Sequence, residues 1–498
     1  MPFSTTNSVK KFTFCSVQIL LMADQACRHV GLPANCSTHF ILGHGMAFTK
    51  FFRKYSFSTF LIHSFSLLLL SNISVAQAQN QGQPQPRTQA PPQPQPQPAI
   101  APAPSLSSQT NFTRLENLGS QIFKDQALSE PRGTSCNDCH MASSGFAGNN
   151  GSKIGVAQGS TPQSIGGRNA MSNAYTSFIP KFQFRVTGED VDPVGGFFWD
   201  GRSDTAEQQA LGPLLNALEM NNKDANSVVR KIAAAPYAQM FKDEFGSQIF
   251  SNPSLAFQKI GVAIAAFERS SALEPFSSKY DQFIQGKAKL TPQESSGMKV
   301  FMDVNKGNCA SCHLMNPNSS KPSDSLFTDF AFYATGIPRN MSIPRNANPS
   351  FFDLGLCGPD RTKPALTSNV PANISIDKFC GTFRMTSLRN TAEKKAWMHN
   401  GFFKDLRDVV SFYATRNSDP KRWYGAKATP NDLPAAYVGN IINDRVPFNR
   451  PPSAGAALTQ REIDDVVAFL KTLSDAPTQE QAPAQQPLVG VRNNPFGN

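Results

Sequence analysis

The motif Cys-x-x-Cys-His occurs twice in this chain and constrains its fold more than any other feature. The two copies are Cys136/Cys139/His140 and Cys309/Cys312/His313. Two thiols at this spacing add to the vinyl groups of a haem, and the adjacent imidazole becomes the proximal ligand of the iron. A zinc site would need more Cys or His nearby, yet residues 79–498 hold a single further histidine, His399. The motifs therefore predict two covalently bound haem c groups rather than zinc or a thioredoxin-like redox pair.

Residues 46–79 have the pattern of a secretion signal. A basic start precedes the apolar stretch 57–70, and a small-x-small cleavage site follows at 76–78. The alternative is a membrane anchor, but the apolar stretch is short and interrupted for a span. We therefore expect a periplasmic protein whose mature chain begins at Gln79 and has no stable membrane span.

Residues 1–45 precede this signal and show no clear pattern. Because a signal of this kind needs a free N-terminus, Met46 is the expected true start. Residues 1–78 as a whole carry six Lys and Arg but a single acid, so much of the net charge of +11 lies there. The remaining chain has a small basic excess and no long basic run, which argues against a nucleic-acid partner.

Composition and a repeat divide the rest of the chain. Residues 79–109 are rich in Gln, Pro and Ala and should form a disordered linker, and 476–498 should form a loose tail. Between them, Gly-x-x-(Ile/Val)-Phe precedes each haem motif, and an amphipathic helix is expected later in each copy, near 255–269 and 462–473. This predicts a mainly α fold with long loops and little sheet.

The predicted fold consists of two cytochrome c-like domains packed together. Residues 110–288 form the first domain and 289–475 the second. The second opens with Thr291-Pro292-Gln293-Glu294, which has the residues of a helix capping box with Pro at the first helical position.

Cys357 and Cys380 are the two cysteines of residues 79–498 that lie outside the haem motifs. After export they would meet an oxidising compartment, so we predict a disulfide between them. Closing that loop would contribute on the order of 3 kcal/mol in the chain-entropy model. The alternative is two buried free thiols.

Further motifs resemble a known family. The stretches are 196–202 (GFFWDGR), 208–220 (QQALGPLLNALEM), 383–390 (FRMTSLRN) and 398–401 (MHNG). Together they are similar to the signatures of the bacterial di-haem cytochrome c peroxidases and their relative MauG, and the likeness covers about residues 110–475. It implies that the haem on His140 reacts with hydrogen peroxide.

The resemblance also implies roles for individual residues of the first site. Glu219 matches the distal acid–base residue, which fits the need to move a proton between the two peroxide oxygens. Gln209 and Pro213 match residues of the distal pocket, and Trp199 matches the tryptophan between the haems. On their own, Glu219 would be read as a solvated helix residue and Trp199 as core packing.

The second haem, on His313, would be the electron-transfer site. Fourteen residues after His399, where the classical members have a methionine ligand, this chain has Tyr413, which is the MauG-like pattern. Tyr413 is therefore expected as the sixth iron ligand, the alternative being an empty sixth position. No histidine lies between His140 and His313, so the first haem is expected to be open without reductive activation.

An inter-haem calcium ion is also implied by the resemblance. Asn173 would supply the side-chain ligand, and the carbonyls of Lys394 and Ala396 would supply backbone ligands. The chain departs from the family here, because the adjacent lysines Lys394 and Lys395 do not favour a bound cation.

These features predict a peroxide-dependent oxidoreductase. Its electrons would come from a small cytochrome c or cupredoxin, or from a partner protein whose side chain is oxidised. The alternatives are a non-catalytic di-haem electron carrier, in which both irons would be six-coordinate, and a haem oxygenase that would react with O2.

Overall fold

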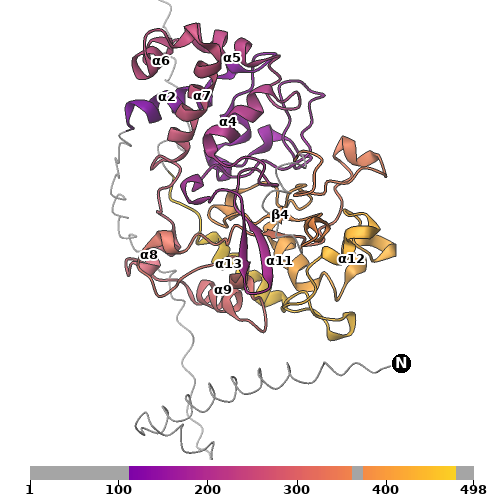
Figure 1. Ribbon diagram of the computed structural model, residues 1–498. Coiled ribbons are helices and arrows are strands. Elements are labelled where there is room, and N and C mark those ends of the chain that lie inside the picture. Colours follow the sequence, from indigo (N-terminus) through magenta and orange to yellow (C-terminus); the bar gives the residue numbers. More distant parts are fainter. Residues whose placement is uncertain (1–111, 362–373, 478–498) are drawn as a thin grey trace, which may run out of the picture. The chain divides into compact units, whose positions relative to one another are not determined.

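Helices provide most of the regular structure in the computed structural model, which describes residues 112–361 and 374–477 (Figure 1). The helices are α2 Arg114–Lys124, α3 Cys136–Cys139, α4 Ala206–Leu215, α5 Ala225–Ala233, α6 Ala238–Phe245, α7 Pro253–Glu268, α8 Lys279–Ile284, α9 Pro292–Met302, α11 Leu406–Thr415, α12 Pro420–Tyr424 and α13 Gln460–Lys471. Two antiparallel strand pairs accompany them: β1 Gln183–Thr187 with β2 Asp190–Val194, and β3 Phe332–Tyr333 with β4 Phe383–Arg384. The expectation of a mainly α fold with little sheet is confirmed.

The described residues all belong to one compact unit. The predicted secretion signal at 46–79 and linker at 79–109 lie outside the described residues, as does the predicted tail beyond residue 477. Across 112–361 and 374–477, no helix combines the length and the apolar character that a bilayer crossing requires.

The internal repeat corresponds to two similar helix pairs. Helix α2 packs against α7, and α9 packs against α13. A Cβ atom at Gly119 would lie 1.9 Å from the carbonyl oxygen of Ala263, and one at Gly297 would lie 1.9 Å from that of Asp465. The glycine in each copy of the repeat therefore lets two helix backbones approach closely.

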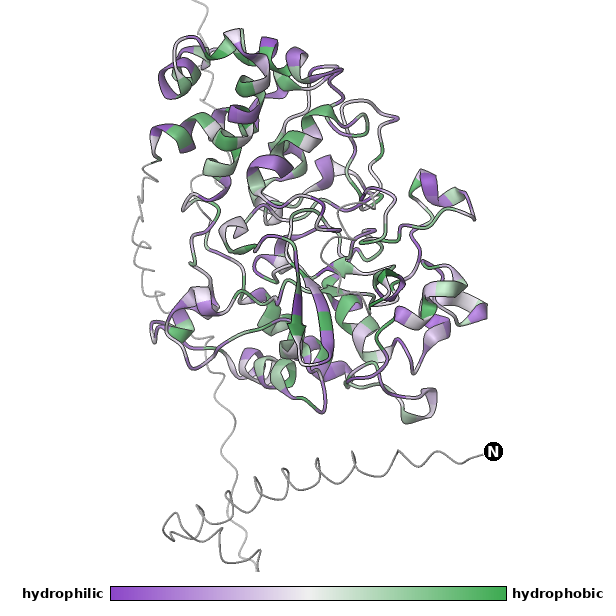
Figure 2. Ribbon diagram, viewed as in Figure 1, coloured by the Kyte–Doolittle hydropathy of each residue, from purple (hydrophilic) through white to green (hydrophobic). Residues whose placement is uncertain are grey.

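Two large clusters of buried side chains form the core. The first lies within residues 112–276, here called the first half, and the second within 280–473, which belongs to the second half (280–477). Figure 2 shows the helices striped with hydrophobic and hydrophilic residues, as expected where one face packs on a core. Tyr280 in α8 packs in the second cluster, although the sequence assigned it to the first domain.

Local sequence signals account for the start of α9. Thr291 accepts from the backbone N–H of Glu294, the Glu294 side chain accepts from the backbone N–H of Thr291, and Pro292 occupies the first turn. The predicted capping box is therefore present, and it satisfies backbone donors that the helix itself leaves unpaired.

Several contacts join the two halves. Arg168 forms a two-pronged ion pair with Asp353, with N···O distances of 2.8 and 2.7 Å. The backbone N–H of Arg384 donates to the carbonyl of Trp199 at 2.8 Å. Cys357 and Cys380 form a disulfide within the second half, with an S–S distance of 2.08 Å, which is the pairing that the sequence suggests.

Candidate active site

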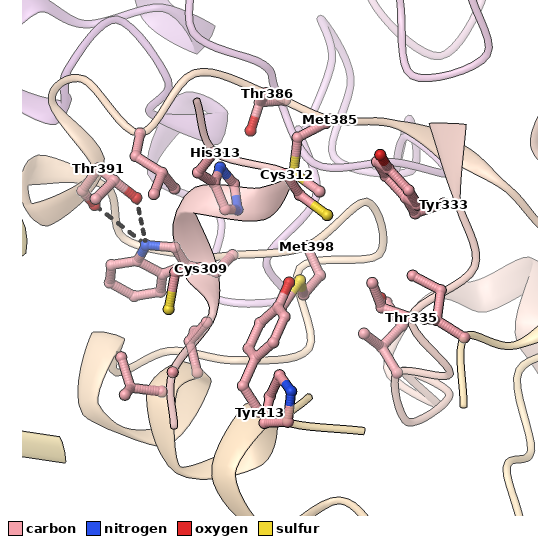
Figure 3. A pocket seen from close by; sticks show the side chains of 18 of the residues that line it. Cys309, Cys312, His313, Tyr333, Thr335, Met385, Thr386, Thr391, Met398 and Tyr413 are labelled. Atoms are coloured by element: carbon pink, nitrogen blue, oxygen red, sulfur yellow. Dashed lines mark hydrogen bonds between the residues drawn. The ribbon is translucent and has the colours of Figure 1, made fainter. Parts of the chain in front are cut away.

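Each Cys-x-x-Cys-His motif forms one helical turn. The backbone N–H of His140 donates to the carbonyl of Cys136 at 2.9 Å, and that of His313 donates to Cys309 at 2.8 Å. Residues separated by three and four positions share a helix face, so both thiols and the imidazole of each motif face one cavity. Figure 3 shows this turn for Cys309, Cys312 and His313.

The two imidazoles are held in the same way. Nδ1–H of His140 donates to the carbonyl of Phe146 at 3.0 Å, and Nδ1–H of His313 donates to the carbonyl of Phe327 at 2.9 Å. Burial lowers the pKa of both rings, so they remain neutral. In each case Nε2 is left as the lone-pair nitrogen, which is the arrangement of an iron-ligating histidine whose second nitrogen is anchored. The residues therefore fit a covalently held haem in each cavity.

The cavity beside His140 contains the three residues predicted for its distal side. Gln209 and Pro213 are one turn apart on α4, and both line the cavity together with Glu219, which follows the helix. Pro213 lies inside α4 and lacks a backbone N–H, and its own carbonyl accepts from the backbone of Met220 at 3.1 Å.

Glu219 is positioned by its neighbours in the same turn. Its Oε1 accepts from the Asn216 amide at 2.8 Å, and its backbone N–H donates to the Asn216 carbonyl at 3.0 Å. Burial raises the pKa of Glu219, while the nearby Arg202 and the bond from Asn216 oppose that shift. A carboxyl with a raised pKa beside the iron site is suited to exchange a proton with a bound substrate.

Trp199 lines both cavities. Its indole N–H donates to the backbone carbonyl of Asn169 at 2.8 Å, and its ring centroid is 6.4 Å from that of His399. Asn169 and Arg384 line both cavities as well. The residue predicted to lie between the two haems is therefore at the boundary of the two spaces that would hold them.

The cavity beside His313 contains Tyr413, which reaches into it from α11 (Figure 3). Burial raises the pKa of the Tyr413 phenol, so the hydroxyl keeps its proton in the absence of a cation. Met385 and Met398 line the same cavity, and sequence analysis did not identify them. Met398 belongs to the motif 398–401, but the motif alone did not indicate that this side chain lines the cavity.

Two buried cations face the second cavity. Arg384 and Lys394 both line it, and burial lowers the pKa of Arg384 to about 10 and that of Lys394 to about 8. Among the described residues, no ion pair to a carboxylate involves either side chain. Haem carries two propionate carboxylates, so a haem in this cavity brings the counter-charges that these side chains need.

The residues predicted to bind calcium do not converge as expected. The Asn173 amide donates to Oε1 of Glu268 at 2.7 Å. The side chain that meets the carbonyl of Ala396 is instead Asn169, whose Nδ2 donates to it at 3.0 Å and to the carbonyl of Met398 at 3.1 Å.

The orientation of the Asn169 amide follows from a chain of hydrogen bonds. The backbone N–H of Ala170 donates to Oδ1 of Asn149 at 2.7 Å, which turns Nδ2 of Asn149 toward Oδ1 of Asn169 at 2.8 Å. The Asn169 edge that faces the Ala396 carbonyl is therefore N–H rather than oxygen. An amide N–H therefore stands where the predicted calcium site needs an oxygen ligand, so this arrangement of the described residues does not fit a calcium ion.

Comparisons with known proteins agree with this geometry. The family model for di-haem cytochrome c peroxidase matches residues 113–289. Methylamine utilization protein MauG of Paracoccus denitrificans is 34% identical over 378 residues, which cover 75% of this chain and 92% of that protein. Cytochrome c551 peroxidase of Pseudomonas aeruginosa is 25% identical over 359 residues, with coverages of 72% and 78%. The crystal structure of the diheme peroxidase BthA from Burkholderia thailandensis is 39% identical, with a TM-score of 0.67, and the match covers 76% of this chain and 91% of that one.

Proposed function

This chain belongs to the family of di-haem cytochrome c peroxidases and MauG proteins, and we propose that it is an exported enzyme that uses hydrogen peroxide as its oxidant. One haem c is attached at Cys136 and Cys139 and the other at Cys309 and Cys312. The observation that carries the proposal is that Trp199 lines both cavities. A single side chain thereby connects a site that contains a carboxylate for proton transfer with a site that contains a tyrosine ligand.

The first site is the place of peroxide reduction. A haem held by His140 would supply the iron for cleavage of the O–O bond. Glu219 takes a proton from the nearer peroxide oxygen and returns it to the farther one, which leaves as water. The Gln209 side chain supplies an amide donor and acceptor at the same cavity, and Pro213 lines it with an apolar ring.

The second site stores and passes electrons. His313 and Tyr413 would bind the iron of its haem, and Arg384 and Lys394, which line the same cavity, would offset the charge of the propionates. A phenolate oxygen is a hard ligand that stabilises ferric iron. Trp199 provides the aromatic path between the sites, fixed in place by its hydrogen bond to Asn169.

Reduction of one peroxide to two waters consumes two electrons and two protons. A partner protein supplies the electrons, either as a small redox carrier or through oxidation of one of its own side chains. Tyr413 supports the second route, because a haem with a tyrosine ligand is a poor acceptor from ordinary donors. The secretion signal expected at 46–79 supports a periplasmic location for this reaction.

Stopped-flow mixing of the ferric holoprotein with peroxide tests this function. We expect a rapid change in the haem absorbance, followed by recovery when a reduced small cytochrome or an oxidisable protein substrate is present. A pure electron carrier would leave the ferric spectrum unchanged on mixing with peroxide, and that result would overturn the proposal.

A further inference from the structure

The cavity beside His140 is completed by the second half of the chain. Arg345 and Asp360 line it together with Glu219 of the first half. The local sequence around Arg345 and Asp360 does not indicate that they return to a site more than a hundred residues earlier in the chain.

Segment 353–361, which carries Asp360, is tied down within the second half. The backbone N–H of Leu356 donates to the carbonyl of Thr382 at 3.1 Å. The Cys357–Cys380 disulfide joins the same two stretches of chain. The disulfide, which the proposed reaction does not use, therefore fixes the segment that reaches the first cavity.

The same segment is also bound to the first half on both sides of Asp360's position. Asp353 pairs with Arg168 through two N···O contacts of 2.7 and 2.8 Å. Arg361 Nη1 donates to the backbone carbonyl of Asp200 at 2.6 Å, and Arg361 is almost fully buried. The bonded residues on both sides of Asp360 therefore hold it at the cavity.

Asp360 meets two arginines at this cavity. Its carboxylate oxygens are 3.6 Å from Arg168 and 3.7 Å from Arg345, which are looser than ordinary ion pairs. Its field raises the pKa of Glu219 beyond the effect of burial, while Arg202 acts in the opposite direction. Arg202 and Asp360 are the charged side chains of the described residues whose fields act on Glu219 in this way.

We propose that Asp360 is a positioning residue for the peroxide reaction, held at the first cavity by the disulfide-tied segment 353–361, and that its charge sets the pH at which Glu219 exchanges its proton. This inference rests on the proposed function, since it assigns a second carboxylate to the same site. The role assigned to Asp360 is exerted through Glu219.

The test compares the holoprotein with Asp360→Asn and with the control Asp192→Asn. Asp192 also pairs with an arginine, Arg185, at 3.4 Å, but lies on the exposed β1–β2 hairpin away from both cavities. The rate of the peroxide-induced absorbance change is measured against pH. With one negative charge removed, Glu219 ionises at lower pH, so the variant should react about threefold faster than wild type on the acidic side.

The variant Gly167→Ala should shift the pH dependence of the peroxide reaction in the opposite direction. A Cβ atom at Gly167 would lie 1.9 Å from Cζ of Arg345, so the guanidinium must shift from its place 3.7 Å from Asp360. Asp360 then loses a counter-ion. The pH at which the rate falls to half its maximum on the acidic side, here called the acidic midpoint, should therefore rise. The variant Cys357→Ser/Cys380→Ser frees the segment and should move the midpoint in the same direction as Asp360→Asn.

Fluoride binding to the ferric protein gives a readout independent of turnover, because anion binding of this kind is favoured by a protonated neighbouring acid. The pH at which fluoride affinity is half-maximal should fall in Asp360→Asn and remain unchanged in Asp192→Asn. An unchanged midpoint in Asp360→Asn would overturn the inference. If wild type does not react with peroxide at all, the proposed function fails, and the fluoride titration alone decides the role of Asp360.

Discussion

Trp199 donates its indole N–H to the backbone carbonyl of Asn169 at 2.8 Å, and both residues line the two cavities. Asn169 in turn donates its backbone N–H to the carbonyl of His399 at 2.7 Å and its amide to that of Ala396. The indole is therefore fixed to the backbone of both halves. A ring held in this way gives electrons a path of fixed geometry between the two sites.

Glu219→Gln tests proton transfer at the first site. Because the carboxylate must accept a proton, the ionised form is active, and wild type should slow as pH falls through the raised pKa of Glu219. The variant should react with peroxide about 10²–10⁴-fold more slowly and lose this pH dependence. Stopped-flow rates across pH measure both effects, and Glu189→Gln on the exposed hairpin serves as a control. A variant with wild-type rates would exclude Glu219 from the reaction.

Tyr413→Phe tests the ligand of the second haem. Loss of the hydroxyl should alter the low-spin signal in the electron paramagnetic resonance (EPR) spectrum and leave the high-spin signal of the His140 haem unchanged. Met398→Leu is the matched variant, since Met398 lines the same cavity and carries the competing sulfur. If Met398→Leu changes the low-spin signal and Tyr413→Phe does not, the thioether is the ligand.

Gly297→Ala tests the close contact between α9 and α13. The added Cβ would lie 1.9 Å from the carbonyl oxygen of Asp465, so the helices must separate. We expect a loss of about 1–3 kcal/mol in the free energy of unfolding, measured by denaturant titration. Gly439→Ala is the control, because a Cβ there meets no atom within 4 Å. Equal stability of the two variants would contradict the packing described here.

A chelator tests the metal content of the inter-haem region. The amide of Asn169 already donates to the carbonyls of Ala396 and Met398. Dialysis of the holoprotein against EGTA should therefore leave its melting temperature and haem spectrum unchanged. Retention of one calcium per chain, with a lower melting temperature after its removal, would show that the Asn169 network opens to admit the ion.

Features set by neighbours in the sequence were predictable. The haem motifs are single helical turns, and the start of α9 is marked by Thr291, Pro292 and Glu294. The repeated glycines, Gly119 and Gly297, signalled the helix pairs because each copy needs the same close approach.

Features that depend on distant segments were not predictable. Asn169, not Asn173, meets the carbonyl of Ala396, and both lie in one short stretch whose direction only the tertiary fold sets. Asp360 reaches the first cavity because its segment is bonded to residues far away in the chain. Lys394 lines a haem cavity, which its expected role as a backbone calcium ligand did not indicate.

EPR spectroscopy of the ferric holoprotein before and after one equivalent of peroxide tests the central claim, that two unequal haem sites act together through Trp199. In wild type, the high-spin and low-spin signals should decrease together. In Trp199→Phe, the high-spin signal should decrease while the low-spin signal persists. A wild-type low-spin signal that does not respond to peroxide, or a variant that behaves as wild type, would contradict the account.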